Sequence, residues 1–579
     1  MKHWITIAVF LMAVCPLVAF GQTDTVYVPG YYESGLTEGT LNAAVTEAIN
    51  AGTLSSKVFK LKLYERYVLS GAITIPAGSS LTVVADDPGS DPQTAPPQIV
   101  WSSSGGITTT YNFDCFGDLT LKNVWVLFAN TSGNQTGTSI KFEENSQPNG
   151  QHGTFEGCLF DYSQIGADGS GAISITCSHF KGSFRNCYFR NMSDPHFRYY
   201  GRPVSFPFNT TGWHTDSLTF VNCTFANFGY CLMQEGSEWS DYVSYNHCTF
   251  INGVMFCLES SWWHYLSITN SVFLNMFMYG DLGENNGNPN GGTFAIDSVK
   301  NFGFSPPFTD DQRHILFTNS SYYIEPWLTD HYLNNPYTDT VSNPVNIPKP
   351  MPMLGPRTLM FLDTVIDGVK RWPYMNRKDL YDNTNPALLL PPTDIPAIKR
   401  FLLAKWTDNA DTNWAFDPGA SLSQTWPLPE NARVTNSTLR TAAMGGFPLG
   451  DLYHWAPGSY ASWKAQEATE NSQIQDMLMN GITSVEENAG VPASFELSQN
   501  YPNPFNPTTM IDYAIQQSGP VSLKVYDLLG REVVTLFDGD QKVGRYSVDF
   551  DGTGLASGVY FYKLQAGSNS ITKKLVLMK

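Results

Sequence analysis

The sequence predicts a mainly β protein in which a right-handed parallel β-helix, a solenoid of short strands, is followed by a small Ig-like β-sandwich. The β-helix is indicated by a short recurring pattern: an apolar residue, two intervening residues, Cys or Ser, one further residue and Phe. Its copies are centred on positions 158, 187, 223, 248 and 271. A repeat length of roughly 20–40 residues is typical of solenoids. The sandwich is indicated by several short alternating strands near the carboxyl end.

A second repeated series shows that each turn of the solenoid carries more than one strand. Tyr230-Cys231-Leu232 and Phe256-Cys257-Leu258 are separated by nearly the same length of chain as Cys223 and Cys248. Apolar and polar residues largely alternate within each copy, as in strands with one face inward. An antiparallel sandwich would need hairpin signals about every 8–12 residues, and Asn-Gly is scarce in this region.

The chain is expected to begin with a secretory signal peptide over residues 1–21. The first residues are basic, and an apolar run from Trp4 to Phe20 follows them. Small residues lie near Gly21, where cleavage is expected. The alternative is a membrane anchor. A helix is then predicted over Thr40 to Ala51, where it would cover the open first coil of the solenoid. Its apolar face consists of Leu41, Val45, Ala48 and Ile49.

The remaining organisation follows from changes in composition. The solenoid with its capping helix is predicted over 22–330. Residues 331–481 are rich in Pro and Trp and are expected to form an irregular segment that wraps the solenoid, with a helix at about 460–480. Residues 482–494 are predicted to be a linker, and 495–579 the sandwich.

Eight cysteines remain after Cys15 leaves with the signal peptide, an even number for an exported protein. Disulfides are one interpretation. However, equivalent strand positions on neighbouring coils lie about 4.8 Å apart with parallel Cβ vectors, whereas a disulfide prefers Cβ atoms about 3.8 Å apart. This geometry favours columns of free, buried thiols. No CxxC or Cys/His spacing occurs, so neither a metal site nor a cofactor is predicted.

The carboxyl-terminal segment carries the most specific motifs. They are Asn500-Tyr501-Pro502-Asn503-Pro504-Phe505, Tyr526 to Val533 with Leu529-Gly530-Arg531, Leu555 to Tyr560 with Ser557-Gly558-Val559, and the terminal Lys573-Lys574-Leu575. The segment resembles the type A sorting domain of the type IX secretion system. This resemblance assigns the sorting signal to Asn500, Pro502, Pro504, Gly530, Gly558, Lys573 and Lys574.

The same resemblance implies a Bacteroidetes-type Gram-negative host, the type IX machinery as partner, and a final location outside the cell or on the outer-membrane surface. Residues 25–330 resemble the pectate-lyase-like β-helix superfamily in architecture, without a specific motif. The formal charge of −18 argues against nucleic acid and anionic lipid as partners. No transmembrane segment is predicted in the mature chain.

Weak catalytic candidates lie between residues 190 and 285. Glu235 and Glu259 follow the second cysteine series and are expected on neighbouring coils. Arg198 and Arg202 lie in a long insertion that could overhang a groove, either as a base or clamp or as a solvated loop. The further members of these groups are Asp194, His196, His214, Asp216, Asp241 and Asp281. Calcium binding at Asp408, Asp411, Asn413 and Asp417 is not favoured, because the EF-hand pattern is missing.

Trp239, Trp262 and Trp263, with His264 and Tyr265, are placed in the turns of consecutive coils. They could stack on sugar rings, or they could be packed under the wrapping segment. The signatures of polygalacturonase-like hydrolases and of pectate lyases are absent. The sequence therefore favours a protein that binds glycan or builds the cell envelope. The alternative is a carbohydrate-active enzyme, a polysaccharide lyase or less readily a glycoside hydrolase, acting on an acidic polysaccharide.

Overall fold

The computed structural model describes most of the chain. The described residues are 24–103, 111–144, 150–163, 171–192, 194, 201–206, 214–234, 239–255, 257–259, 262–280, 292–299, 306–338, 345–407, 411–412, 414–416, 422–423, 425–482 and 495–579.

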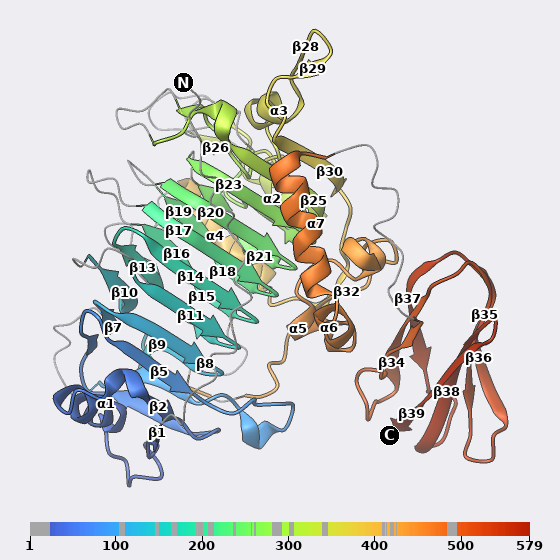
Figure 1. Ribbon diagram of the computed structural model, residues 1–579, viewed down its shortest axis with the longest axis horizontal. Coiled ribbons are helices and arrows are strands. Elements are labelled where there is room, and N and C mark those ends of the chain that lie inside the picture. Colours follow the sequence, from blue (N-terminus) through green and yellow to red (C-terminus); the bar gives the residue numbers. More distant parts are fainter. Residues whose placement is uncertain are drawn as a thin grey trace, which may run out of the picture.

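The main body of the molecule is a parallel β-helix, as the recurring pattern predicts (Figure 1). Successive coils contribute strands to three ladders of hydrogen-bonded parallel strands. The first ladder contains β2 (Lys57–Lys60), β5 (Ser80–Val84), β8 (Asp118–Lys122), β11 (His152–Glu156), β14 (Phe180–Arg185), β17 (His214–Val221), β20 (Trp239–Asn246) and β23 (Trp263–Thr269). The second contains β3 (Arg66–Leu69), β6 (Gln98–Trp101), β9 (Trp125–Asn130), β12 (Leu159–Asp161), β15 (Tyr188–Met192), β18 (Thr224–Phe228), β21 (Thr249–Gly253) and β24 (Val272–Leu274). The third contains β4 (Ile73–Ile75), β7 (Tyr111–Cys115), β10 (Ser139–Glu143), β13 (Ile173–Thr176), β16 (Val204–Phe206), β19 (Leu232–Gln234) and β22 (Leu258–Glu259).

Aromatic side chains stack along the interior of the solenoid. The register pairs Phe155 with Phe184 and Phe184 with Phe220, and the ring centroids of these pairs lie 4.9 and 4.6 Å apart. Phe220 and Tyr245 continue the stack at 4.5 Å. Stacked aromatic pairs contribute about 0.5–1.5 kcal/mol each beyond the area they bury. The repeated Phe of the sequence pattern therefore builds the core.

The cysteines form columns of free thiols, the interpretation that the strand spacing favours. All eight described cysteines are free and buried. The Cys187 thiol donates to the carbonyl oxygen of Phe155 on the preceding coil, with Sγ and oxygen 3.4 Å apart, and the Cys223 thiol donates to that of Phe184 at 3.4 Å. Each of these thiols is thus hydrogen-bonded to a backbone carbonyl of the preceding coil and is not part of a disulfide.

We expect the thiols to be unreactive while the protein is folded. Burial raises the pKa of Cys187 and Cys248 well above the ordinary thiol value, and the reactive species is the thiolate. A thiol-specific chromogenic reagent should detect almost no cysteine in the native exported chain and all eight in guanidinium chloride without reductant. Recovery of only four or six thiols in denaturant would show that disulfides are present.

From β8 onward, a tight turn joins each strand of the first ladder to a strand of the second. Asn186, Asn222 and Asn270 occupy equivalent turn positions with φ of 55°, 50° and 53°. Asn tolerates this left-handed conformation better than most residues because its short amide can bond locally. The Asn that precedes Cys or Ser in the sequence pattern is therefore a turn residue, and a row of such turns runs along one edge of the solenoid.

Further elements continue or cover the solenoid at each of its two ends. Helix α1 (Thr40–Asn50) lies at the N-terminal end, and its buried residues Leu41, Val45 and Ala48 join the solenoid core. At the other end β25 (His314–Tyr323) runs through both the first and second ladders. The parallel sheet continues past residue 330, since β30 (Met375–Asp382) pairs with β25 as a further rung. At the N-terminal edge, β1 (Asp24–Tyr27) pairs with β2.

Residues 383–482, which we call the wrap, return along the solenoid (Figure 1). The helices from residue 324 onward are α2 (Pro326–Asn334), α3 (Pro356–Asp363), α4 (Ile395–Thr407), α5 (Leu452–Trp455), α6 (Pro457–Lys464) and α7 (Glu467–Asn480). Short antiparallel pairs are β26 (Tyr337–Thr338) with β27 (Val345–Asn346), β28 (Val365–Ile366) with β29 (Val369–Lys370), and β31 (Leu388–Leu390) with β32 (Asn431–Val434). The single helix predicted at 460–480 is two helices, because its polar middle offers no continuous apolar face.

The carboxyl-terminal residues form the predicted β-sandwich. One sheet contains β33 (Glu496–Leu497), β34 (Thr508–Ile515) and β37 (Gly544–Asp551). The other contains β36 (Glu532–Gln541), β35 (Gly519–Tyr526), β38 (Gly558–Ala566) and β39 (Asn569–Leu577). Ile511 and Tyr513 of the first sheet share a core with Leu523 and Tyr562 of the second.

Candidate functional site

The outer face of the second ladder is covered by the wrap. Ala432 and Trp455 of the wrap belong to a buried apolar cluster on this face. Its solenoid members include Val100, Leu127, Tyr188, Ala226, Ile251 and Leu274. A face that packs against the protein's own chain is not available to an extended ligand. The second ladder is therefore not the face on which an extended ligand binds.

A buried ion pair connects the wrap to this face. The Arg190 guanidinium lies 2.6 Å from the Asp161 carboxylate on the preceding coil and 2.7 Å from the Glu430 carboxylate of the wrap. The Tyr188 hydroxyl donates to the same Glu430 oxygen at 3.1 Å. Burial opposes the charge on Arg190, but the two carboxylates outweigh it and raise the pKa of Arg190 above its ordinary value. The arginine therefore stays charged, and the interaction depends on all three groups.

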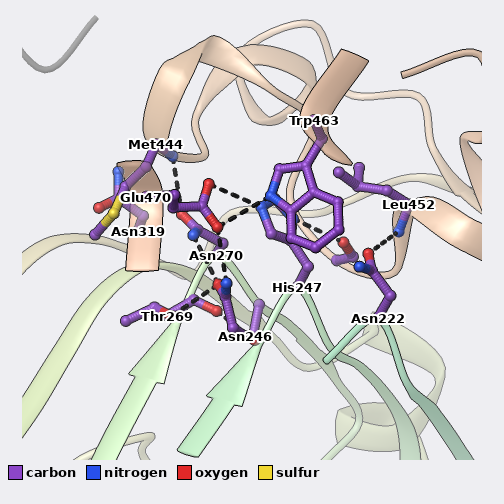
Figure 2. A network of polar contacts seen from close by, with 12 residues as sticks. Asn222, Asn246, His247, Thr269, Asn270, Asn319, Met444, Leu452, Trp463 and Glu470 are labelled. Carbon is purple, nitrogen blue, oxygen red and sulfur yellow. Dashed lines mark hydrogen bonds and ion pairs between the residues drawn. The ribbon is translucent and has the colours of Figure 1, made fainter. Parts of the chain in front are cut away.

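The turn residues between the first and second ladders also bind the wrap, as Figure 2 shows. Glu470 of α7 accepts hydrogen bonds from the side-chain amide of Asn246 at 2.7 Å and the indole N–H of Trp463 at 3.0 Å. His247 Nε2 lies 3.3 Å from the other Glu470 oxygen. Asn270 accepts from the backbone N–H of Met444 at 2.9 Å. The row of turns is a docking strip for the wrap, so its polar side chains serve structure.

The ion pairs of Glu467, next to this docking strip, predict that the stability of the folded protein decreases at low pH. Glu467 pairs with Arg185 at 2.6 Å and with Lys464 at 2.7 Å. Burial opposes ionisation, yet the two cations lower the pKa of Glu467 below its ordinary value of 4.5. A depressed pKa contributes stability that is complete above about pH 4.5 and is lost as the pH falls through the folded-state value. Glu467→Gln should therefore flatten the acid side of the stability curve measured by denaturant unfolding.

The control for that measurement is Glu33→Gln, because Glu33 pairs with Lys62 at an exposed position. We expect the control to keep the wild-type pH dependence. Identical curves for Glu467→Gln and the unmodified chain would contradict the assignment.

The third ladder keeps polar side chains on its outer face, and four of them form what we call the Asp114 cluster. Tyr111 and Asp114 come from β7, and Lys141 and Glu143 from β10, which is the next strand of the ladder. Lys141 Nζ lies 2.7 Å from a Glu143 oxygen and 3.0 Å from the Tyr111 hydroxyl. The ammonium also lies 4.8 Å from the centroid of the Tyr111 ring. All four side chains are half-buried.

The two carboxyl groups of the Asp114 cluster are in different electrostatic environments. Burial raises the pKa of Asp114 above its ordinary value, and the Glu143 carboxylate adds to the rise. Glu143 instead is ion-paired with Lys141 and accepts a hydrogen bond from the Thr176 hydroxyl at 3.2 Å. Two acidic groups in such different surroundings, beside a cation and a phenol, can both hold and polarise a bound molecule.

Sequence reasoning missed the Asp114 cluster because β7 and β10 precede the copies of the Cys-x-Phe pattern. The alternation of charged and apolar residues in these two strands does indicate which side chains point outward. Asp114 lies between the buried residues Phe113 and Cys115, and Lys141 lies between the buried residues Ile140 and Phe142. Charged residues at alternate strand positions between core residues must point outward.

A second polar row, which we call the rim, runs along the edge where each coil passes from the third ladder to the first. Its members are His179, Lys181, His214, Asp216, Trp239, Asp241, His264, Tyr265 and His314. His214 stacks on Trp239 with ring centroids 4.7 Å apart, and Tyr265 stacks on His314 at 4.9 Å. The structure thus brings together several predicted candidates, namely His214, Asp216, Trp239, Asp241, His264 and Tyr265.

The three candidate tryptophans have different positions. Trp239 and Trp263 are the first residues of strands β20 and β23, whereas the sequence places them in turns. Trp239 is half-buried. Trp262 and Trp263 are 4% and 0% exposed, so neither offers a free ring to a sugar. Trp263 belongs to the solenoid core and Trp262 packs with Val299 and Phe308, so neither ring lies in a cluster formed with the wrap.

The catalytic candidates do not assemble into one described site. Arg202 is 3% exposed, and its guanidinium lies 5.5 Å from the centroid of the Tyr230 ring, so it does not overhang a groove. Asp194 is also buried. The backbone of Glu259 pairs with Met233 in the third ladder. Outside the described residues lie Glu235, Arg198, His196, Asp281, Asp408, Asn413, Asp417 and the Glu259 side chain.

The predicted sorting residues divide into structural and exposed groups. The Asn500 side chain is buried and donates to the Pro502 carbonyl at 3.1 Å and to the Thr509 hydroxyl at 3.0 Å. Gly530 closes a turn with φ of 75°, a conformation that favours glycine. Pro502, Pro504 and Lys574 are exposed, and Gly558 and Lys573 are half-buried. The lysines lie on β39, an edge strand of the four-stranded sheet.

The sandwich can now be identified. Residues 499–578 match the secretion system C-terminal sorting domain. The resemblance stated for the motifs over 495–579 is thereby confirmed, and the segment is a type IX sorting domain. It implies that the protein is exported through the type IX secretion system to the cell surface or the medium. No curated protein matches the chain.

No helix among the described residues is long and apolar enough to cross a membrane.

Proposed function

We propose that the exported protein binds a polysaccharide at the half-exposed part of the third ladder formed by β7 and β10, with the Asp114 cluster as the central contact. The observation that supports this proposal is the difference in exposure between the outer faces of the second and third ladders. The wrap covers the second ladder, whereas Tyr111, Asp114, Lys141 and Glu143 remain half-exposed on the third. A stiff row of parallel strands about 4.8 Å apart suits a repeating polymer.

The chemistry of the Asp114 cluster fits a glycan. The Tyr111 ring offers an apolar face with a hydroxyl at its edge, which matches the mixed apolar and polar surface of a sugar. Lys141 and Glu143 supply charged hydrogen-bonding groups, which bind neutral hydroxyls well. Lys141 also attracts a carboxylate, and burial favours the neutral form of Asp114, which can donate to one. An acidic polysaccharide is therefore the favoured ligand despite the overall negative charge of the chain.

Trp239 of the rim is included in the proposal as a peripheral aromatic contact. It lies at the start of β20, on the edge that the third ladder shares with the first. Trp262 and Trp263 are buried and make no contact with the ligand in this proposal.

Binding should be measured with the purified full chain and a panel of acidic and neutral polysaccharides, by affinity electrophoresis and calorimetry. Lys141→Met is expected to raise the dissociation constant for the bound polysaccharide at least about tenfold, because a charge-assisted hydrogen bond contributes about 1.5–3 kcal/mol. The matched control is Lys122→Met, since Lys122 pairs with Glu156 at 3.1 Å on the first ladder. Equal affinities for the two variants, or no binding to any polysaccharide, would overturn the proposal.

A second candidate function, a polysaccharide lyase, is supported by one further observation. The Tyr111 hydroxyl oxygen accepts from Lys141 Nζ at 3.0 Å, and such an ammonium stabilises negative charge that develops on the oxygen during proton transfer. In such a step Tyr111 Oη would take the C5 proton of a uronate, and the C4–O bond would break as the C4–C5 double bond forms. The leaving O4 would take the proton back from the Tyr111 hydroxyl, while the Lys141 ammonium offsets the charge of the sugar carboxylate. Tyr111→Phe would then abolish the release of unsaturated ends while leaving binding within about threefold. Absence of unsaturated products from every uronate polymer would leave binding as the function.

A further inference from the structure

We propose that the rim holds one divalent cation of the zinc type, ligated by His179, His214 and Asp216. The ligands of this site belong to the first ladder and not to the Asp114 cluster, although Trp239, the peripheral contact of the proposed polysaccharide site, stacks on His214. The ligand atoms offered by these three side chains all lie within 4.8 Å of one another. His179 Nδ1 is 3.0 Å from Asp216 Oδ1, and His214 Nε2 is 3.8 Å from the same oxygen.

The fold brings the three residues together from two neighbouring coils. His179 directly precedes β14, and its backbone has a left-handed φ of 60°. His214 is the first residue of β17, which pairs with β14. The register pairs Phe180 with Thr215 and Lys181 with Ser217, so Asp216 is an extra residue in a bulge. Bulges re-aim side chains, and this one places Asp216 beside both histidines.

The geometry is suitable for tetrahedral coordination. Zinc binds imidazole nitrogen and carboxylate oxygen at about 2.0–2.2 Å, so two ligand atoms of one tetrahedral site lie about 3.3 Å apart. The two separations of 3.0 and 3.8 Å are on either side of this value. A small movement of the exposed His179 ring and of the Asp216 carboxylate toward His214 would bring all three atoms into place. Three protein ligands leave a fourth position for water or for an oxygen of a bound molecule.

The ligand chemistry selects the class of cation. Two imidazoles and one carboxylate suit zinc, copper and nickel, whereas calcium and magnesium prefer oxygen ligands throughout. Copper and nickel would compete in a titration, since affinity follows the Irving–Williams order. Zinc is the cation we assign because it accepts tetrahedral geometry without a preference of its own.

The surroundings of the site are compatible with a cation. Lys181 Nζ lies 3.3 Å from Asp216 Oδ2 and leaves Oδ1 for the metal. The His214 ring is stacked on Trp239 with an interplanar angle of 3°, which limits its rotation. The sequence could not reveal this site because His179 and His214 lie far apart along the chain, without a recognised metal-ligand spacing.

The first ladder also offers a matched control. His152 Nδ1 lies 3.4 Å from Asp118 Oδ1 on the preceding coil, so it forms a His–Asp pair with the same exposed fraction of 48% for the histidine as at His179. Among the described residues, no third metal-ligating side chain joins this pair in a cluster. If zinc simply bound to any exposed histidine, replacing His152 and replacing His179 would weaken zinc binding to the same extent.

The experiment uses the full chain, stripped with a chelator and titrated with Zn²⁺ by calorimetry and with Co²⁺ by visible absorption. We expect one Zn²⁺ per chain and a tetrahedral Co²⁺ spectrum that Zn²⁺ displaces. His179→Ala and Asp216→Asn should each weaken Zn²⁺ binding at least about tenfold and remove the Co²⁺ spectrum. His152→Ala should leave both unchanged. His179 is exposed, so its variant should fold, which circular dichroism would verify.

Absence of Zn²⁺ binding in the unmodified chain would overturn the assignment. So would equal losses of affinity in His179→Ala and His152→Ala, which would indicate adventitious binding. An octahedral Co²⁺ spectrum, unchanged by Asp216→Asn, would show that the carboxylate is not a ligand.

Discussion

Deleting residues 495–579 is expected to abolish the appearance of the protein at the cell surface and in the medium. The segment is a type IX sorting domain, and the machinery that recognises it would no longer receive a signal. The rest of the chain should remain folded, because the solenoid and the sandwich have separate hydrophobic cores. Polar contacts between the wrap and the domain include Ser459 with Asp512 at 2.8 Å and Arg440 with Asp549 at 3.2 Å. Fractionation and surface protease digestion would locate the truncated chain.

Two controls make the deletion interpretable. Fusion of residues 495–579 to an unrelated exported carrier should direct that carrier to the surface, which tests whether the domain is sufficient. The truncated chain should also show the same solenoid core by circular dichroism and protease resistance. Undiminished surface exposure after the deletion would contradict export through this domain.

Replacing Arg190 with Met is expected to lower the free energy of unfolding by several kcal/mol, about 3–5. Asp161 and Glu430 would remain buried as carboxylates without their cation, and breaking a buried ion pair in this way costs about 3–5 kcal/mol. The side chain of Glu430 is 0% exposed, so water cannot replace the arginine without displacing the wrap. We expect a lower denaturant midpoint and faster proteolysis within the wrap.

The matched control for Arg190 is an exposed pair with similar bonding. Arg377 donates through Nε and Nη2 to Asp363, and their side chains are 42% and 43% exposed. Arg377→Met should change the unfolding free energy by less than about 1 kcal/mol. Arg190→Met combined with Glu430→Gln should be less destabilised than Arg190→Met alone, because one of the stranded charges is removed. Equal effects of Arg190→Met and Arg377→Met would contradict a structural role for the buried pair.

Local periodicity was sufficient to predict the solenoid. The Phe and Cys positions repeat once per coil and point inward, and the structure stacks them there. Residues between them carry less information. Trp263 follows Trp262 directly, and a shift of one residue in a strand exchanges the inner and outer faces, so the sequence could not decide which rings were exposed.

The contacts that hold the wrap against the solenoid could not be predicted from the sequence. Glu430 and Glu470 lie far along the chain from Arg190 and Asn246, their partners on the solenoid. No local pattern connects such residues, and a glutamate in a polar stretch is usually solvated. The rim was partly predictable, since His214, Asp216 and Trp239 were candidates. Their assembly with His179 depends on the bulge at Asp216, which propensities do not reveal.

Hydrogen–deuterium exchange with and without bound polysaccharide tests the central claim most directly. The claim is that the part of the third ladder formed by β7 and β10, and not the face under the wrap, holds the ligand. We predict slower exchange in β7 and β10, at residues 111–115 and 139–143, with no change in β15, β18 and β21 of the second ladder. Protection confined to the second ladder or to the sorting domain would contradict it.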